Sequence, residues 1–205
     1  MANRRSSDPS RDGEERGRGP GRPRDPKRDT AILEAALELM AREGYARMSI
    51  AEVARAAGVS KPTVYRRWSG KPDLATAALA SFALSEPPVE GDTARARLVS
   101  ALGNFRRSLL RPNGMAMLGT LLAEEAHNPE LLELFRERIV AARRERLTAI
   151  LEEGRAAGEI HRDADLEAAV NLLVGSFYAR YLTGRGVDEG WPERVVALLW
   201  PALEE

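Results

Sequence analysis

Apolar residues recur at helical spacing along nearly all of the chain after residue 26. Between Thr30 and Arg42 they fall at positions i, i+1, i+4, i+5 and i+8, the stripe of an amphipathic helix. Similar stripes follow, separated by joints that carry Pro or Gly. The pattern predicts an all-α fold whose further helices cover residues 50–57, 61–68, 71–84, 93–110, 115–126, 129–153, 163–183 and 191–203.

The second and third of these helices are short and lie close together in the sequence. Ser49 and Glu52 form a capping-box pattern that begins the second helix, and Gly58 ends it. Ser60 begins the third helix, in whose first turn Pro62 is tolerated because its missing amide hydrogen has no partner there. A glycine-containing turn of this length sets two helices at a steep angle. The spacing predicts a helix-turn-helix, whose second helix enters the major groove of DNA.

Composition excludes several classes of protein. The longest obvious apolar run, Val195 to Trp200, is far shorter than the roughly 18 residues that cross a bilayer. No Leu, Ile, Val, Phe, Tyr or Trp precedes Ile32, so no secretory signal is predicted and we expect a cytoplasmic protein. The chain has no Cys and only 2 His, so we expect neither disulfides nor a metal site, and no cofactor.

The formal net charge of zero conceals two unlike parts. Residues 1–72 hold 16 Lys and Arg against 10 Asp and Glu, whereas residues 73–205 hold 15 against 21. Neutralising phosphates requires local basic charge, so this asymmetry favours a polyanion-binding N-terminal part.

The first 26 residues are rich in Arg, Gly, Pro and Ser and contain nothing to bury, so we expect a disordered basic tail. Within it, Pro20-Gly21-Arg22-Pro23-Arg24 resembles the AT-hook. In that motif a thin Gly-Pro backbone and flanking arginines, here Arg22 and Arg24, fit the narrow minor groove of A·T tracts. The alternative is a solvated basic leader.

The stretch from Ile32 to Leu79 resembles the DNA-binding domain of the TetR (tetracycline repressor) family of bacterial transcription regulators. The family pattern of Gly-Tyr, Ser-x-x-x-Ile/Val-Ala and Ala-Gly-Val-Ser-x-x-Thr-Leu-Tyr-x-His-Phe-x-x-Lys is matched without insertion. The matching segments are Gly44-Tyr45, Ser49 to Ala54, and Ala57 to Lys71. Val64, Arg67 and Trp68 depart from the pattern, and Arg67 replaces a histidine with a cation.

The resemblance implies which side chains contact DNA. Those matching Thr63, Tyr65 and Lys71 contact phosphates in the family, and those matching Lys61, Pro62 and Arg66 lie near base edges or the backbone. Six basic residues and one acidic residue between Gly44 and Pro72 agree with such a surface. Each cation could instead be a solvated surface charge, and Tyr65 could pack under the helix. The candidate DNA-binding residues are Arg22, Arg24, Ser49, Lys61, Pro62, Thr63, Tyr65, Arg66, Arg67 and Lys71.

The second half resembles the C-terminal regulatory domain of the TetR family in outline, which implies a dimer built from its last two long helices. Two apolar stripes at helical spacing fit such a bundle seam. The alternative is an intramolecular core, although a helix that is apolar on two faces needs two partners. The candidate dimer residues are Leu166, Val170, Leu173, Phe177 and Tyr181 in one helix, and Val195, Leu198 and Ala202 in the next.

Another face of the penultimate helix carries Asn171, Gly175 and Tyr178, which combine polar groups with room. Small-molecule pockets usually mix apolar walls with a few polar groups. The same residues could equally be plain core, and Asn171 could set dimer register through a buried hydrogen bond. The candidate effector-binding residues are Phe105, Met115, Met117, Leu121, Phe135, Asn171 and Tyr178.

These observations divide the chain into a tail (1–26), a helix-turn-helix domain (27–72) and a helical regulatory and dimerisation domain (73–205). We interpret the protein as a sequence-specific regulator, a ligand-responsive repressor that binds a palindromic operator as a homodimer. An enzyme is disfavoured, because the pairs Glu124-Glu125 and Glu152-Glu153 diverge by about 100° on a helix and no catalytic motif is present. An architectural DNA-binding protein would lack the specificity for one operator.

Overall fold

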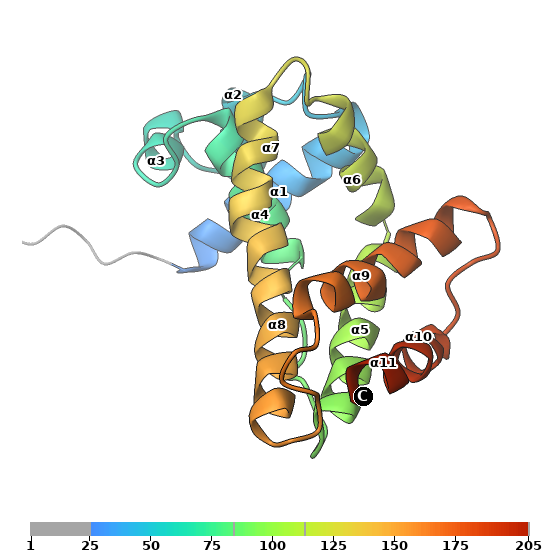
Figure 1. Cartoon of the computed structure of the whole chain (residues 1–205). Helices are drawn as coiled ribbons and strands as arrows, with labels where there is room; N and C mark the ends of the chain where they lie inside the picture. Colours follow the sequence, from blue (N-terminus) through green and yellow to red (C-terminus); the bar gives the residue numbers. More distant parts are fainter. Residues whose placement is uncertain (1–25, 84, 113, 205) are drawn as a thin grey trace, which may run out of the picture.

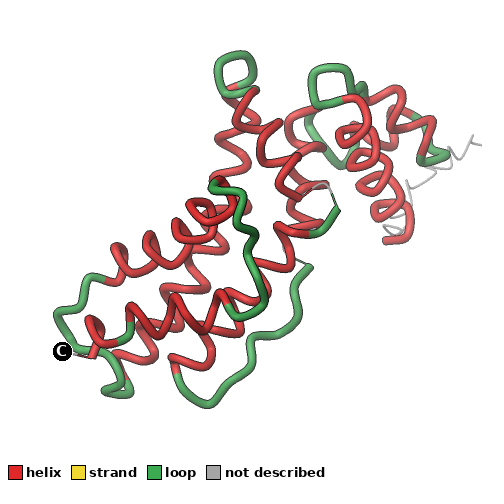
Figure 2. The backbone as a smooth tube through the Cα atoms, turned by 90° about the vertical axis from the view of Figure 1, so that its right-hand side faces the viewer, coloured by secondary structure: helices red, strands yellow, loops and turns green. Residues whose placement is uncertain are grey.

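The computed structural model describes residues 26–83, 85–112 and 114–204, and the regular elements among them are all helices (Figures 1 and 2). The predicted all-α class is therefore confirmed. None of these helices is long and apolar enough to cross a membrane. The elements are α1 (Pro26–Glu43), α2 (Ile50–Ala56), α3 (Lys61–Tyr65), α4 (Lys71–Ala83), α5 (Ala94–Leu110), α6 (Gly114–Ala123), α7 (Pro129–Phe135), η1 (Arg136–Val140), α8 (Ala141–Ala156), α9 (Leu166–Leu182), α10 (Trp191–Leu199) and α11 (Pro201–Glu204).

Several predicted helices differ in their bounds from those observed, and the predicted helix 191–203 is divided into α10 and α11. The third ends at Tyr65 rather than Trp68, because Arg66 and Arg67 turn the chain before α4 begins. The predicted helix 129–153 is a continuous rod of α7, η1 and α8, in which η1 is a π-helical segment (Figure 1). Such segments are rare and occur frequently at functional sites.

The buried apolar side chains form two cores. One belongs to helices α1 to α4 together with α6, α7 and η1, and includes Ile32, Val53, Leu74 and Leu121. The other belongs to α5 and α8 to α11 and includes Leu102, Phe177 and Trp191. In Figure 1 these appear as an upper and a lower lobe, joined by the rod of α7, η1 and α8.

Helix α4 packs with the first lobe, since Leu74, Ala75, Ala78 and Leu79 are all buried there. The predicted boundary after residue 72 would fall in its first turn. The predicted tail lies outside the described residues except for Pro26, which begins α1. Helix α4 thus connects the short helices α2 and α3 to the rest of the molecule.

Candidate DNA interface and effector pocket

Local interactions build the predicted helix-turn-helix. The Ser49 hydroxyl accepts a hydrogen bond from the Glu52 amide at 3.3 Å and donates to the Glu52 carboxylate at 2.7 Å, which completes the capping box. The bond from Ser49 lowers the pKa of Glu52 below its usual value. Gly58 ends α2 at a φ of +64°, a left-handed conformation that favours glycine. The hydroxyl of Ser49, a predicted DNA contact, is thus occupied within the protein.

The outer face of α3 presents four of the predicted DNA-binding residues to solvent. Lys61, Pro62 and Arg66 are exposed, and the side chain of Tyr65 is 56% exposed. Figure 1 shows α3 at the outer edge of the upper lobe. The side chain of Tyr65 therefore does not pack under the helix, and the outer face of α3 exposes cationic and hydroxyl groups of the kind with which a recognition helix contacts DNA.

Thr63 is buried at the inner edge of this face. Its hydroxyl shares a hydrogen bond with the Ser60 hydroxyl at 2.9 Å and accepts one from Arg66 at 3.3 Å. These bonds hold the first turn of α3 and orient Arg66. A contact between Thr63 and a phosphate stays a prediction.

Arg67 turns inward, which corrects its assignment as a DNA contact. Its guanidinium forms an ion pair with Asp29 of α1 and donates to the Thr63 carbonyl at 3.2 Å. The side chain is only 16% exposed. Arg67 therefore fastens the end of α3 to α1 rather than facing the groove.

We expect Arg67→Ala to lower the free energy of unfolding by about 1 to 2 kcal/mol, because it leaves Asp29 without its charged partner. Operator affinity should fall equally for all base variants of the site. Urea denaturation of R67A, D29A and the double variant should give a coupling of about 1 kcal/mol. An R67A protein of unchanged stability that relaxes specificity at one base pair would restore Arg67 as a base-reading residue.

Lys71 begins α4 and contacts the loop that joins α1 to α2. Its ammonium donates to the Ala46 carbonyl at 2.9 Å and lies 4.3 Å from the centroid of the Tyr45 ring. Burial lowers the pKa of Lys71, and burial raises the pKa of Tyr45 to about 12. Lys71 therefore fixes the start of α4, and its contact with a phosphate stays a prediction. Arg22 and Arg24 lie outside the described residues.

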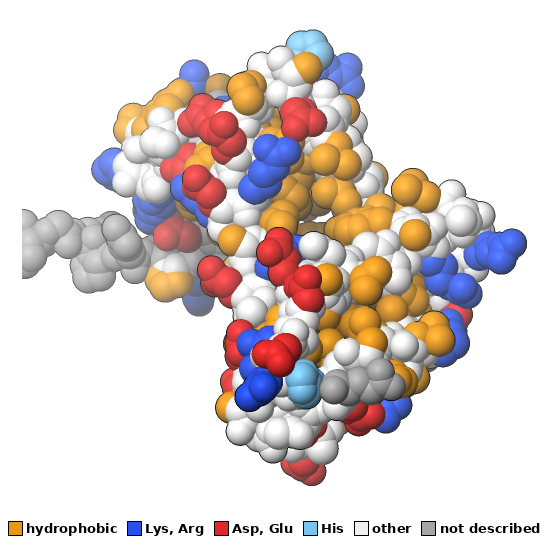
Figure 3. All heavy atoms as spheres, in the orientation of Figure 1, with side chains coloured by type: hydrophobic (Ala, Val, Ile, Leu, Met, Phe, Trp, Pro, Cys, Tyr) orange, Lys and Arg blue, Asp and Glu red, His pale blue; other side chains and the backbone are white. Residues whose placement is uncertain are grey.

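Two adjoining pockets lie between the lobes, where Figure 3 shows apolar side chains gathered around a hollow. The empty space in the two pockets, including the part that is open to solvent, is about 650 and 410 Å³. Phe135, Arg143 and Tyr178 line both pockets, so the two spaces meet there.

Five of the seven predicted effector residues line these pockets. Asn171 and Met115 do not: Asn171 is exposed and accepts a hydrogen bond from Arg144 at 2.7 Å, and Met115 packs against the lower core. Asn171 lies with the exposed Leu172 on the outer side of α9, whereas its neighbour Val170 lies on the buried side. The five that line the pockets are Phe105, Met117, Leu121, Phe135 and Tyr178.

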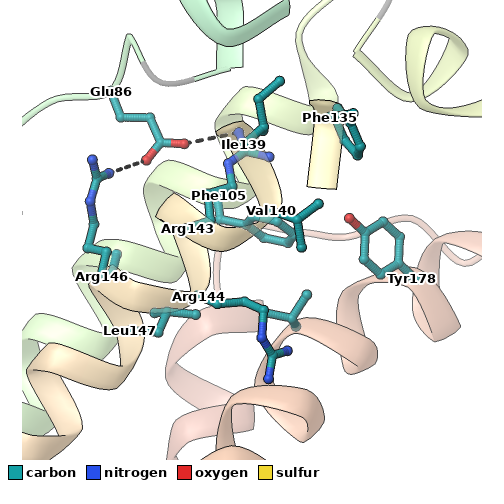
Figure 4. Close-up of a pocket in the computed structure, with 12 residues that line it drawn as sticks. Glu86, Phe105, Phe135, Ile139, Val140, Arg143, Arg144, Arg146, Leu147 and Tyr178 are labelled. Carbon is teal, nitrogen blue, oxygen red and sulfur yellow. Dashed lines mark hydrogen bonds and ion pairs between the residues drawn. The ribbon is translucent and has the colours of Figure 1, made fainter. Parts of the chain in front are cut away.

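The charged side chains of the first pocket were missed by sequence reasoning. The Glu86 carboxylate is 4% exposed and accepts hydrogen bonds from Arg143 at 3.1 Å and from Arg146 at 2.7 Å (Figure 4). Arg143 also donates to the Ser108 hydroxyl at 2.6 Å and lies 5.2 Å from the centroid of the Phe105 ring. Burial lowers the pKa of Arg143 and raises that of Tyr178, whose hydroxyl therefore stays protonated at neutral pH.

An ion pair connects the pocket wall to the start of α4. Arg138 of η1 donates to the Asp73 carboxylate at 2.6 Å, and Asp73 accepts from the Ser69 amide at 2.8 Å. Burial raises the pKa of Asp73, but the bonds from Ser69 and Arg138 outweigh it and leave the pKa below its usual value. The neighbouring η1 residues Ile139 and Val140 line the pocket. Segment η1 thus touches both the pocket and the end of the helix-turn-helix.

The structure corrects the predicted dimer face on α9. Leu166, Val170, Leu173 and Phe177 are buried in the lower core of the single chain, so they cannot meet a partner. Val195 is partly buried against the same core, and Tyr181 stacks on Phe177 with its own side chain 38% exposed. Only Leu198 and Ala202 of the predicted set lie fully on the surface.

A different stripe of small and apolar residues lies exposed on α9 and α10. Leu182 is 81% exposed and Leu198 is 83% exposed, and a group of exposed apolar side chains marks an interaction surface. On α9 the positions recur at spacings of 4, 3, 4 and 3 residues. We call this set the α9/α10 stripe: Ala168, Leu172, Gly175, Ala179 and Leu182 of α9, with Leu198 of α10 and Ala202 of α11.

Comparison with known proteins agrees with this architecture. Residues 32–78 match the family described as bacterial regulatory proteins, tetR family, and residues 88–199 match the tetracyclin repressor-like C-terminal domain. The fold and its basic outer helix are those of a bacterial helix-turn-helix regulator. The two family matches define the family within that class. The chain belongs to the TetR family, so the resemblance found in residues 32–79 is confirmed. Regulators of this family are not enzymes.

Individual relatives cover most of the chain. It is 30% identical over 178 residues to the uncharacterized HTH-type transcriptional regulator YdeS of Bacillus subtilis (strain 168), covering 86% of this chain and 89% of YdeS. It is also 30% identical over 173 residues to the DNA-binding transcriptional repressor TetR of Mycobacteroides abscessus, covering 82% and 90%. The solved structure of the flavonoid-responsive regulator FrrA superposes with a TM-score of 0.62 at 28% identity. The superposition covers 84% of this chain and 93% of the FrrA chain.

Proposed function

We propose that this transcription regulator is a repressor that binds a palindromic operator as a homodimer and releases it when a small molecule enters the interlobe pocket. The observation that carries the DNA-binding part is the outer face of α3, where Lys61, Pro62, Tyr65 and Arg66 are exposed together. Cationic and hydroxyl groups on one short helix can contact both base edges and phosphates.

The homodimer is supported by the α9/α10 stripe. Its small residues let two helices approach closely, and its leucines supply apolar area. A two-fold dimer places two copies of α3 against two half-sites, which explains why operators of such proteins are palindromic.

Effector response is supported by the interlobe pocket and by the contacts of η1. A molecule that displaces Ile139 or Val140 would disturb the bond between Arg138 and Asp73, which sits beside the last turn before α4. Repression is supported by the Mycobacteroides abscessus relative, and ligand response by the flavonoid-responsive FrrA. Typical couplings of about 1 to 3 kcal/mol would weaken operator binding roughly 5- to 150-fold.

The test of DNA recognition uses variants of α3 on the operator selected from random DNA. We expect Arg66→Ala to cost about 1 to 3 kcal/mol of affinity and to relax preference at one base pair of each half-site. Tyr65→Phe should weaken all sequences alike, because its hydroxyl is assigned to a phosphate. Fluorescence anisotropy across single-base variants measures both effects.

Arg185→Ala is the matched control, because Arg185 is an exposed arginine in the loop between α9 and α10, far along the chain from α3. Its affinity should equal that of the wild type. Equal binding by R66A and the control would show that α3 does not read the operator. Wild-type affinity that is the same for the selected operator and bulk DNA would favour an architectural role instead.

A further inference from the structure

The charges that line the first pocket are unbalanced. Three arginines, Arg143, Arg144 and Arg146, lie along its α8 wall, and Glu86 is the acidic residue opposite them among the described lining residues. Figure 4 shows the Arg143 and Arg146 side chains directed at Glu86, and Arg144 directed elsewhere, toward the α9 side. An apolar pocket with excess positive charge favours a ligand that carries a negative charge.

The remaining lining is apolar. Phe105, Phe135, Val140, Leu147 and Val174 surround the first pocket. The adjoining pocket continues this surface with Leu79, Phe82, Leu109, Met117, Leu118 and Leu121. The Tyr178 hydroxyl, at the junction of the two pockets, is directed into the space (Figure 4). The two pockets together therefore offer a long apolar surface. Its hydrogen-bond donors are the arginines of α8 and the Tyr178 hydroxyl.

Glu86 occupies the place that an anionic group would take. Its carboxylate bonds to both Arg143 and Arg146, while Arg146 remains 38% exposed and lines the first pocket. A ligand carboxylate can form the same charge-assisted hydrogen bonds, because guanidinium groups bind any carboxylate in this geometry.

We propose that the effector is an amphipathic organic carboxylate whose charged group replaces Glu86 at Arg143 and Arg146 while its apolar body lies along the two pockets. This inference rests on the proposed effector response of the same pocket. It names the class of ligand and the contact that the ligand breaks.

Release of Glu86 has a structural consequence. Glu86 lies three residues after the end of α4, and the next residue, Pro87, accepts a hydrogen bond from Asn104 of α5 at 3.0 Å. The bonds of Glu86 to Arg143 and Arg146 thus tie the segment after α4 to α8. An anion that replaces Glu86 removes this tie to α8 and leaves the end of α4 held by Arg111, which lies 4.6 Å from the centroid of the Phe82 ring.

Calorimetry on the wild-type protein tests the ligand class with two body shapes. Decanoate and 2-naphthoate are the anionic probes, decanol and 2-naphthalenemethanol their neutral counterparts, and decylamine the cation. At least one carboxylate should bind tenfold or more tightly than its neutral counterpart, and decylamine should bind more weakly than decanol. Equal binding of acid and alcohol in both pairs, or no binding by either acid, overturns the proposal.

Variants test the exchange itself. Glu86→Gln removes the competing charge, so the affinity for the carboxylate should rise about tenfold and that for its alcohol should change less than twofold. The triple variant E86Q/R143Q/R146Q removes both guanidiniums that the ligand carboxylate would contact and should lose the preference for the acid. Arg162→Gln, an exposed arginine outside the pocket, is the control, and thermal melting verifies folding.

Operator binding separates this inference from the proposed function. In E86Q the carboxylate should bind more tightly yet weaken operator binding less than in the wild type, because the contact that it breaks is already weakened. A carboxylate that binds with the expected charge dependence but leaves operator affinity unchanged would overturn effector response and retain the ligand class. Carboxylate affinity that falls in E86Q would overturn the exchange with Glu86.

Discussion

Replacing both Leu172 and Leu198 with glutamate should convert the protein to a monomer and lower its affinity for a palindromic operator by two orders of magnitude or more. Both leucines belong to the exposed α9/α10 stripe. Glutamates there would repel one another across the dimer contact, and dimerisation would have to remove their carboxylates from water without a charged partner. A monomer binds one half-site only. It therefore lacks the effective concentration by which the first bound subunit favours binding of the second, an effect that raises overall affinity by about 10²- to 10⁴-fold.

Sedimentation velocity at micromolar concentration measures the change of mass, and anisotropy measures operator binding. Ala157→Glu adds a single charge at an exposed position at the end of α8, outside the stripe, and should remain dimeric. The monomeric variant should keep its helical circular dichroism, since neither leucine belongs to a core. A double variant that still sediments as a dimer would place the interface elsewhere.

Periodicity was sufficient to predict the helices but not which face of α9 meets a partner. The helix carries two stripes with the same spacing: one through Val170 and Phe177, and one through Leu172 and Ala179. Both satisfy the pattern of a buried helix face. Which is internal depends on α5, α8 and α10 packing against the first stripe, and such contacts between distant segments leave no mark in local spacing.

Charged residues show the same limit. Arg67 looked like a DNA contact because it adjoins the recognition helix, but its partner Asp29 lies 38 residues earlier on α1. Arg143 and Arg146 stand in a charged stretch of the predicted helix 129–153, and Glu86 sits in the Pro-rich joint after α4. Only the fold brings the carboxylate to the two guanidiniums, so the charged part of the pocket could not be predicted from spacing.

The motif residues were predictable where the local sequence itself determines the geometry. The capping box of Ser49 and Glu52 and the left-handed Gly58 need only neighbouring residues, and both are observed. The exposed face of α3 follows from the same local turn, together with the burial of Val64 and Trp68 beneath it.

Phe177→Ala should act on stability rather than on assembly. The Phe177 side chain is 0% exposed, and its ring lies 5.3 Å from that of Phe105 and 5.5 Å from that of Trp191. Removing a buried phenylalanine costs about 3 to 5 kcal/mol through lost burial and the cavity that remains. That is a large part of the roughly 5 to 15 kcal/mol that stabilises a typical domain.

The measurement is best made in the L172E/L198E monomer, where urea unfolding is independent of dimer dissociation. There, F177A should lower the free energy of unfolding by the full 3 to 5 kcal/mol, because all partners of Phe177 belong to its own chain. Leu110→Ala, at a partly exposed leucine on α5, should change it by less than about 1 kcal/mol. If F177A leaves the monomer's stability unchanged but splits the wild-type dimer, Phe177 belongs to the interface after all, and the packing of α9 described above is wrong.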